Sequence, residues 1–214
     1  MVDLDCWNQE KVFCIGLNKT GTVSLEKALG DLGYRMGSQP YGESLLKNYL
    51  ARDFSPIIEF CKTADAFQDV PFSLPYTYVL LDHYFKNAKF ILSVRDSPEQ
   101  WYKSLVTFHS NAFFQGKRPT EEMLREETYR YKGFMWDGQY GIIPALRTKT
   151  DPYDMQSHFD FYNAHNDSVR VYFNGRANML EINLAQPGTY QKTCEFLGRE
   201  PVADTFPWLN RSTQ

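Results

Sequence analysis

The sequence lacks several features that mark common classes of protein. No run of residues approaches the ~20 apolar residues of a membrane-spanning helix. Its charge is nearly balanced, with 23 Lys and Arg against 26 Asp and Glu, so it has no general basic surface for a nucleic acid. Its first residues are acidic and polar, unlike a secretory signal. We therefore expect no membrane partner, no nucleic-acid partner and a cytoplasmic location.

Cysteine is also scarce. The four cysteines are scattered, without a Cys-x-x-Cys pair or another spacing typical of a metal site. Buried, reduced thiols in a reducing compartment are the simplest interpretation. With 43% hydrophobic residues, a chain of 214 residues can bury a substantial core, and we expect a single domain over residues 1–214. The cysteines are Cys6, Cys14, Cys61 and Cys194.

The segment from Lys11 to Gly33 is the most informative part of the chain. Its apolar run at 12–15 predicts a short buried strand. After it, apolar residues recur at helical spacing, and Gly33 stands where a helix commonly ends. The glycine-bounded loop between them, residues 16–22, would place backbone N–H groups at a helix N-terminus. Such an arrangement favours a bound phosphate, because unpaired donors and the helix dipole both attract an anion.

This loop keeps the glycine spacing of a Walker A loop but not its other functional residues. A Walker A loop reads Gly-x-x-x-x-Gly-Lys-Ser/Thr, and Gly16 and Gly21 preserve that spacing. Thr22 stands in place of the lysine, and Val23 in place of the hydroxyl that binds magnesium. A valine cannot bind a metal ion, and the nearest cation is Lys19, inside the loop. The loop therefore predicts phosphate binding without a metal and argues against ordinary ATP or GTP hydrolysis.

Residues 16–22 resemble the phosphosulfate-binding loop of the sulfotransferases that use 3′-phosphoadenosine 5′-phosphosulfate (PAPS). The nearest resemblance is to the P-loop sulfotransferase-like family, whose loop runs Gly-Leu-x-Lys-Thr-Gly-Thr. It implies a P-loop NTPase-like α/β fold, PAPS as cofactor and 3′,5′-adenosine bisphosphate (PAP) as product. It also implies a set of residues that bind the cofactor's phosphosulfate: Lys19, Thr20, Gly21, Thr22, Val23 and Ser24.

A second match lies at 89–105, where an apolar run ends at Arg95. Ser97 is placed to cap the following helix. In the sulfotransferase pattern, a strand-end arginine and a serine of the next helix bind the 3′-phosphate, for which a guanidinium offers a charge-assisted pair of hydrogen bonds. Arg95 and Ser104 fit those roles. Their spacing is one residue longer than usual, so Ser97 remains an alternative to Ser104, and an ion pair with a neighbouring carboxylate remains an alternative role for Arg95.

A third match is Asp69, which is followed by Val70 and Pro71. The nearest family usually carries Asp-x-Pro at this strand end, where cytosolic sulfotransferases have a catalytic histidine. The resemblance therefore implies that Asp69 removes the proton of the acceptor, while Lys19 neutralises the charge on the bridging oxygen. The alternative is that Asp69 only caps a helix predicted over 74–86.

The order of predicted elements favours a parallel sheet flanked by helices. Phosphate ligands bind at the carboxyl ends of the strands in such sheets, which is where Gly16, Asp69 and Arg95 fall. Residues 108–173 form a helical insert rich in aromatic residues, some of which we expect to line an acceptor pocket. Strands are predicted at 11–16, 65–69, 90–95 and 178–183, and helices at 24–32, 55–62, 74–86, 98–107, 120–173 and 188–197.

These observations predict a sulfotransferase that moves a sulfuryl group from PAPS to a hydroxyl or amine. The acceptor is expected to be a small molecule or a glycan. Two alternatives remain at this stage. One is a nucleotide-dependent kinase on the same fold, and the other is an inactive nucleotide-binding module that keeps the loop for structure.

Overall fold

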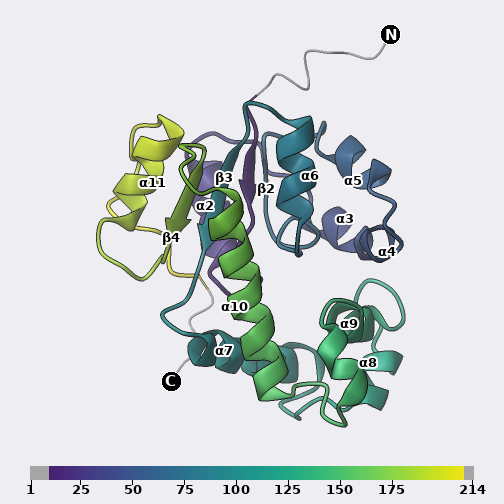
Figure 1. Cartoon of the computed structure of the whole chain (residues 1–214). Helices are drawn as coiled ribbons and strands as arrows, with labels where there is room; N and C mark the ends of the chain where they lie inside the picture. The colour runs from purple at the N-terminus through teal and green to yellow at the C-terminus, as the bar shows by residue number, and fades with distance from the viewer. Residues whose placement is uncertain (1–9, 210–214) are drawn as a thin grey trace.

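The computed structural model describes residues 10–209, which form a four-stranded parallel sheet with helices on both faces (Figure 1). The strands follow the order β2-β1-β3-β4 across the sheet. They are β1 (Val12–Cys14), β2 (Ala66–Phe67), β3 (Lys89–Ser93) and β4 (Met179–Ile182). This arrangement confirms the predicted fold class and all four predicted strand positions.

The strand register brings the expected site residues to one edge of the sheet. Phe13 of β1 pairs with Phe67 of β2 and with Phe90 of β3. All pairings are parallel, so the carboxyl ends of the strands share one edge. Asp69 lies two residues beyond the end of β2, and Arg95 lies two residues beyond the end of β3. The topology therefore carries both residues to the edge where the loop after β1 begins.

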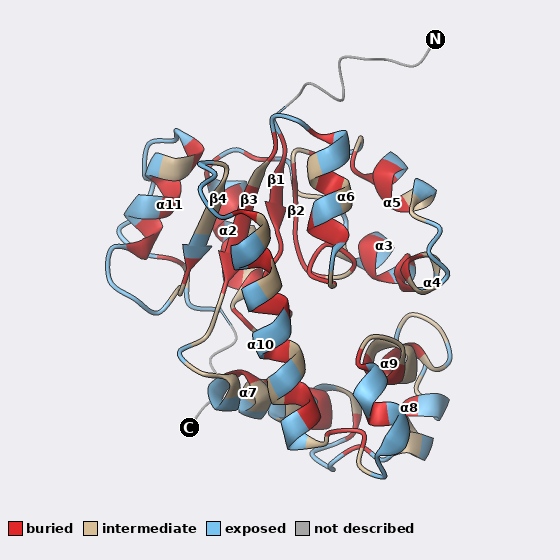
Figure 2. Cartoon of the chain, in the orientation of Figure 1, coloured by how far each residue is buried: buried red, intermediate tan, exposed pale blue. Residues whose placement is uncertain are grey.

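One face of the sheet packs against α6 (Thr77–Tyr84) and α10 (Met155–Tyr172). α10 crosses the sheet in front of the strands in Figure 1. The strands are short, and β1, β2 and most of β3 are buried, as is usual for the centre of a parallel sheet between helices, whereas β4 is partly exposed (Figure 2). The main core on this face includes Phe13, Phe67, Phe90, Tyr78, Leu81, Val169 and Phe173.

The opposite face is covered by α2 (Thr22–Asp31) and α11 (Thr189–Leu197). The apolar side chains of α2 recur at helical spacing, which confirms the predicted amphipathic helix. Gly33 has a φ of 90°, the left-handed conformation common just after a helix, and the helix ends there as predicted. The second core includes Val12, Cys14, Ile91, Leu25, Ala28, Leu29 and Cys194.

Three short helices lie between α2 and β2. α5 (Ser55–Phe60) was predicted at nearly this position, whereas α3 (Gln39–Ser44) and α4 (Leu46–Leu50) were not. Each of these two unpredicted helices covers fewer than two turns, so no hydrophobic period can develop along it. α7 (Pro98–Phe113) runs further than predicted, and Ser97 caps it as expected, its hydroxyl oxygen accepting from the Gln100 N–H at 3.3 Å.

The region expected as a long helical insert contains several short helical segments. Its first residues belong to α7, and its last belong to α10, which packs against α7. The intervening segments are two short helices, α8 and α9, a π-helical turn and a 3₁₀ turn. In Figure 1, α8 and α9 lie below α3 and α4. These segments are α8 (Glu121–Glu126), α9 (Phe134–Trp136), η1 (Asp137–Gly141) and η2 (Pro144–Thr148).

The three cysteines within residues 10–209 are buried free thiols. Burial raises the pKa of the Cys14 and Cys61 thiols, so both stay protonated and unreactive. Cys6 lies outside the described residues. Within the described part of the chain, no helix combines the length and apolar character needed to cross a membrane.

We expect Gly16→Ala to destabilise the protein. A Cβ at residue 16 would lie 2.3 Å from the Ser93 carbonyl oxygen, a backbone atom that cannot move aside cheaply. The free energy of unfolding should fall by about 1–3 kcal/mol or more, as is typical of overpacking. Urea titration measures it, with Gly30→Ala as the control, because nothing lies within 4 Å of that position. The control should gain about 0.5–1 kcal/mol from helix propensity; an equal effect of both variants would contradict the close contact at Gly16.

Candidate functional site

The N-terminus of α2 presents a row of unpaired backbone donors. The first backbone hydrogen bond of this helix runs from the Leu25 N–H to the Gly21 carbonyl oxygen at 3.0 Å. The N–H groups of Gly21, Thr22, Val23 and Ser24 have no acceptor among residues 10–209, and no side chain caps the helix. Unpaired donors at the positive end of a ten-residue helix form an anion site.

The loop before α2 is held in one conformation by local contacts. Gly21 has a φ of 102° and Lys19 a φ of 66°, so two residues of the loop adopt the left-handed region. The Thr20 hydroxyl donates to the Leu17 carbonyl oxygen at 2.6 Å. Its oxygen lies 2.6 Å from the Ser93 Oγ, which must be the donor because the Thr20 hydrogen is already used. The hydroxyl of Thr20 therefore supports the loop from inside, while the unpaired N–H groups at the start of α2 remain available to a ligand.

Arg95 and Trp101 hold the same loop from the side of β3 and α7. The Arg95 Nε donates to the Lys19 carbonyl oxygen at 2.7 Å, and the Trp101 Nε1 donates to the Asn18 carbonyl oxygen at 2.8 Å. The other two nitrogens of the Arg95 guanidinium have no partner among the described residues, and burial lowers the pKa of this group. Arg95 thus lies beside the loop with two cationic nitrogens free.

The alternative role for Arg95 finds no support in its contacts. None of the ion pairs within residues 10–209 includes Arg95. The neighbouring carboxylate of Asp96 accepts instead from the Asn183 Nδ2 at 2.7 Å and from the Gln100 Nε2 at 3.0 Å. The guanidinium is therefore oriented toward the loop and away from a structural ion pair.

Both candidate serines lie on or beside α7. Ser97 is committed as the cap of that helix, although its hydroxyl can still donate. Ser104 lies three residues after Trp101 and four residues before Phe108, so helical spacing puts these three on one face. Because Trp101 and Phe108 both contact the loop, through Asn18 and Lys19, that face is turned toward the anion site.

Lys19 is the loop's own cation. Its Nζ lies 2.9 Å from the centroid of the Phe108 ring, a cation–π contact. Burial lowers the pKa of Lys19 to about 8, against the opposing attraction of Asp69 and Glu43. A bound anion would favour the protonated form, so an occupied site would hold Lys19 charged.

Asp69 is buried at the same edge of the sheet. Its Oδ2 accepts from the Thr22 hydroxyl at 3.2 Å and its Oδ1 accepts from the Val70 N–H at 2.8 Å. Burial and the charge of Glu43 raise the pKa of this carboxyl, while Lys19 lowers it. α6 begins at Thr77 and has Tyr76 as its N-cap, so the alternative that Asp69 caps this helix is wrong.

Glu43, which the sequence analysis did not identify, contributes to the electrostatic environment of Asp69. Glu43 is 7% exposed and forms an ion pair with Arg130, whose Nε lies 2.5 Å from the Glu43 Oε2. Its Oε1 accepts from the Gln39 Nε2 at 3.0 Å, one turn earlier on α3. The only signal in the sequence is the four-residue spacing of Gln39 and Glu43, and the same spacing of polar residues occurs on the exposed faces of helices in general.

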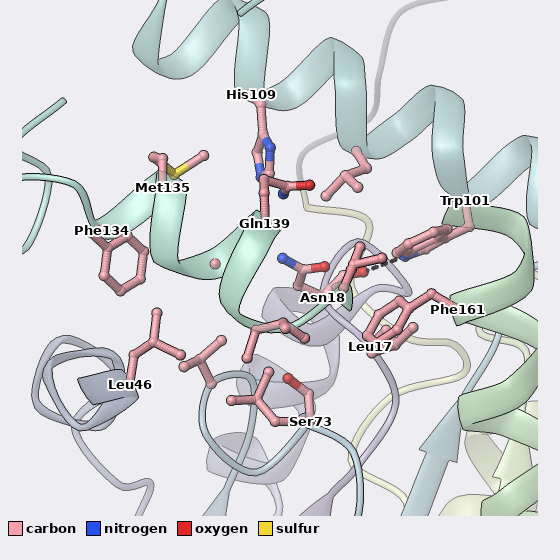
Figure 3. A pocket seen from close by; sticks show the side chains of 16 residues that line it. Leu17, Asn18, Leu46, Ser73, Trp101, His109, Phe134, Met135, Gln139 and Phe161 are labelled. Carbon is pink, nitrogen blue, oxygen red and sulfur yellow. Dashed lines mark hydrogen bonds between the residues drawn. The ribbon is translucent and has the colours of Figure 1, made fainter. Parts of the chain in front are cut away.

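An apolar cavity of about 80 Å³ opens beside the loop (Figure 3). Leu17 and Asn18 of the loop line it, and so does Val70, the neighbour of Asp69. α7 and the π-helical turn η1 form its other side, to which His109 and Gln139 belong (Figure 3). His109 continues the four-residue spacing of Trp101 and Leu105, a pattern from which its position could have been predicted. Of the aromatic residues in the predicted insert, Phe134 and Phe161 line the cavity, together with Trp101, which lies outside the insert.

The hydroxyl groups nearest the anion site are engaged within the protein. Thr22 donates to Asp69, and the Ser24 Oγ accepts from the Leu209 N–H at 3.2 Å. Val23 is the second residue of α2, and its side chain has no oxygen atom that could bind a metal ion. Among residues 10–209, no group of three or more His, Cys, Asp or Glu residues is placed to hold a metal ion.

Because the pKa of Lys19 is lowered, we expect anion binding to depend on pH in the range where this lysine titrates. The affinity for inorganic sulfate, whose charge is constant above neutral pH, should fall as pH rises through about 8, because the neutral lysine of the free protein contributes no attraction. Nuclear magnetic resonance titrations at several pH values measure it. Lys19→Met should bind weakly at every pH, and Lys27→Met, an exposed residue of α2 paired with Asp31, should keep the native profile. A pH-independent affinity in the native protein would contradict this role of Lys19.

A family model described as a sulfotransferase domain matches residues 11–214. No curated protein matches the chain. The matched span includes the loop, Asp69, Arg95 and the residues that line the cavity.

Proposed function

The chain belongs to the sulfotransferase domain family, and from that premise we propose that it moves a sulfuryl group from PAPS to a hydroxyl or amine of a small-molecule or glycan acceptor. One observation carries the proposal. Four unpaired N–H groups at the start of α2 lie beside Lys19 and Arg95, whereas Val23 stands where a Walker A loop has the hydroxyl that binds magnesium. This donor set suits a multiply charged anion bound without a metal.

The residues present fit the two charged ends of PAPS. The N–H groups from Gly21 to Ser24 would hold the 5′-phosphosulfate, whereas the Thr20 N–H already donates to the Leu17 carbonyl oxygen at 3.3 Å. The free nitrogens of Arg95 would bind the 3′-phosphate, with the Ser104 hydroxyl as a neutral donor and Ser97 as the alternative. When bound, PAPS supplies a sulfuryl group already activated by its phosphate leaving group.

Lys19 and Asp69 would carry the chemical step. Sulfuryl transfer, like phosphoryl transfer, leaves the protein mainly to position the reactants and to stabilise charge. The Lys19 ammonium would neutralise the charge that develops on the bridging oxygen. Asp69 would accept the proton of the acceptor hydroxyl or amine, and its raised pKa makes it a better base than an exposed carboxylate.

The kinase alternative requires a magnesium ligand that this loop does not offer, because Val23 stands at the position of the metal-binding hydroxyl. An inactive binding module would have no need to keep a buried, high-pKa carboxyl beside the loop cation. The contacts of Asp69 and Lys19 thus favour a catalytic site.

A transfer assay tests the proposal. PAPS labelled with radioactive sulfur is incubated with the protein and a set of phenols, alcohols, amines and oligosaccharides, and the products are separated by chromatography. We expect label in at least one product, formed equally well with EDTA and with magnesium. PAP that binds tightly without any transfer across such a set would contradict catalysis and favour the inactive module.

A further inference from the structure

The cavity beside the loop contains no ionised side chain. Its walls are mainly apolar, and its polar members are Asn18, Ser73, His109 and Gln139. Burial and the nearby charge of Lys19 lower the pKa of His109 to about 3, so its imidazole is neutral. A charged group that entered this space would lose its hydration without finding a partner of opposite charge, which is costly.

The hydrogen bond of His109 fixes which ring nitrogen carries the proton. The Tyr153 hydroxyl lies 2.8 Å from the His109 Nδ1, and Tyr153 is fully buried. No other acceptor for that hydroxyl exists among the described residues, and an unpaired buried O–H costs about 1–3 kcal/mol. The hydroxyl therefore donates to Nδ1, and the proton of the neutral ring is on Nε2. No described residue accepts from this Nε2–H, and Figure 3 shows the ring directed into the cavity.

A similar argument orients the amide of Gln139. The His158 Nδ1 lies 2.8 Å from the Asp154 carbonyl oxygen, which can only accept, so Nδ1 carries the proton. Burial lowers the pKa of His158, so its Nε2 is a bare acceptor. The structure places the Gln139 Oε1 2.9 Å from this nitrogen. Because two acceptors cannot share a hydrogen bond, we assign the NH₂ group of Gln139 to this position, which turns the amide oxygen the other way. The oxygen of Gln139 is then an acceptor on the same side of the cavity as the Nε2–H of His109.

These two groups lie across the cavity from the turn that begins at Asp69. Ser73 lines the opposite side in Figure 3, and its N–H donates to the Asp69 carbonyl oxygen at 2.9 Å within one turn. A molecule in the cavity would therefore meet the Asp69 turn at one end and His109 with Gln139 at the other. One neutral donor beside one neutral acceptor matches a hydroxyl group, which both accepts and donates.

We propose that His109 and Gln139 are specificity-determining residues that bind a second, non-reacting hydroxyl of the acceptor, and that the acceptor is a compact, uncharged compound with an apolar body. This assignment rests on the proposed sulfuryl transfer for the identity of the reacting end. His109 supplies a hydrogen bond to the hydroxyl oxygen, and Gln139 accepts the hydroxyl hydrogen. The apolar walls exclude carboxylates, ammonium groups and bulky, strongly hydrated glycans.

Three matched probes test it: 4-hydroxybenzyl alcohol, p-cresol, which lacks the second hydroxyl, and 4-hydroxybenzoate, which carries a charge in its place. Calorimetry measures their binding to the whole protein with and without saturating PAP. We expect the alcohol to bind about tenfold or more tightly than p-cresol, because p-cresol leaves two buried polar groups unpaired, and the benzoate to bind weakest. Equal binding of the alcohol and p-cresol, or tightest binding of the benzoate, would overturn the assignment.

Variants separate recognition from structure. His109→Phe should abolish the preference for the alcohol over p-cresol and leave the affinity for PAP unchanged. His109→Gln, which can still donate from an amide, should restore part of that preference. In a transfer assay the loss should appear in the acceptor KM more than in kcat. A preference for the alcohol that survives in His109→Phe would overturn the role of His109. If a variant does not fold, the ratio of the affinities of the native protein for the alcohol and for p-cresol still tests the proposal.

The same measurements distinguish failure of this inference from failure of the proposed function. If PAP binds and the alcohol shows no advantage over p-cresol, the specificity assignment is wrong and the sulfotransferase proposal stands. If the alcohol is preferred and PAP does not bind, the cavity recognises a hydroxyl as inferred and the proposed PAPS chemistry is wrong.

Discussion

Asp69→Asn is expected to lower turnover on the order of 10²–10⁴-fold while PAP affinity stays nearly unchanged. The asparagine cannot take the acceptor's proton, but it can keep the local structure. Its amide oxygen can accept from the Val70 N–H, and its NH₂ group can donate to the Thr22 hydroxyl oxygen. Residue 69 has a φ of 58°, which asparagine tolerates as well as aspartate does.

Single-turnover rates under saturating PAPS measure this effect, with melting temperature and PAP affinity as controls for folding. Glu43→Gln gives an independent check, because it leaves Asp69 in place and removes a charge that raises its pKa. Activity requires the ionised carboxylate, so the fall of activity at acidic pH should move to lower pH in this variant. An Asp69→Asn protein that turns over at the native rate would mean that the base lies elsewhere.

Arg95→Ala should weaken PAP by about 2–4 kcal/mol, or roughly 30- to 1,000-fold. The two free nitrogens of this buried guanidinium are the donors assigned to the 3′-phosphate. Adenosine 5′-phosphosulfate lacks that phosphate, so its affinity should fall much less. Some loss is expected for both ligands, because the Arg95 Nε also holds the Lys19 carbonyl oxygen at 2.7 Å.

Calorimetric titration of both ligands into both proteins gives the comparison. Arg35→Ala is the matched control: Arg35 is exposed and paired with Asp65, just ahead of β2 and so at the opposite edge of the sheet. It should leave both affinities at the native value. Ser104→Ala should show the pattern of Arg95→Ala more mildly. Equal losses for the two ligands in Arg95→Ala would mean that Arg95 only supports the loop.

Much of the fold followed from local patterns. Each strand is a short apolar run, and a parallel sheet buried on both faces produces such runs. Ser97 and Gly33 marked the ends of helices because capping depends on the chemistry of single residues. α3 and α4 were not predicted because both are short and are stabilised by packing that no local pattern records, and α3 also contains Pro40 and Gly42, which disfavour a helix.

The sequence predicted which residues lie together at the candidate site, but it did not predict the contacts between them. Strand-end positions sufficed to bring Asp69, Arg95 and the loop to one edge of the sheet. Sequence spacing does not reveal that the Arg95 Nε donates to the Lys19 carbonyl oxygen, or that residue 69 adopts a left-handed conformation. The helical spacing of Trp101, Leu105 and His109 could have indicated the face of α7 that lines the cavity, but it could not show that Gln139 of a π-helical turn lines the same cavity.

Calorimetric titration of the native protein with PAP tests the central claim most directly, namely that the α2 cradle with Lys19 and Arg95 binds a 3′-phosphorylated adenosine nucleotide without a metal. We predict a dissociation constant in the micromolar range, unchanged between EDTA and magnesium, and much weaker binding of ATP under both conditions. Tight binding of ATP that depends on magnesium, or PAP binding that EDTA abolishes, would contradict the account.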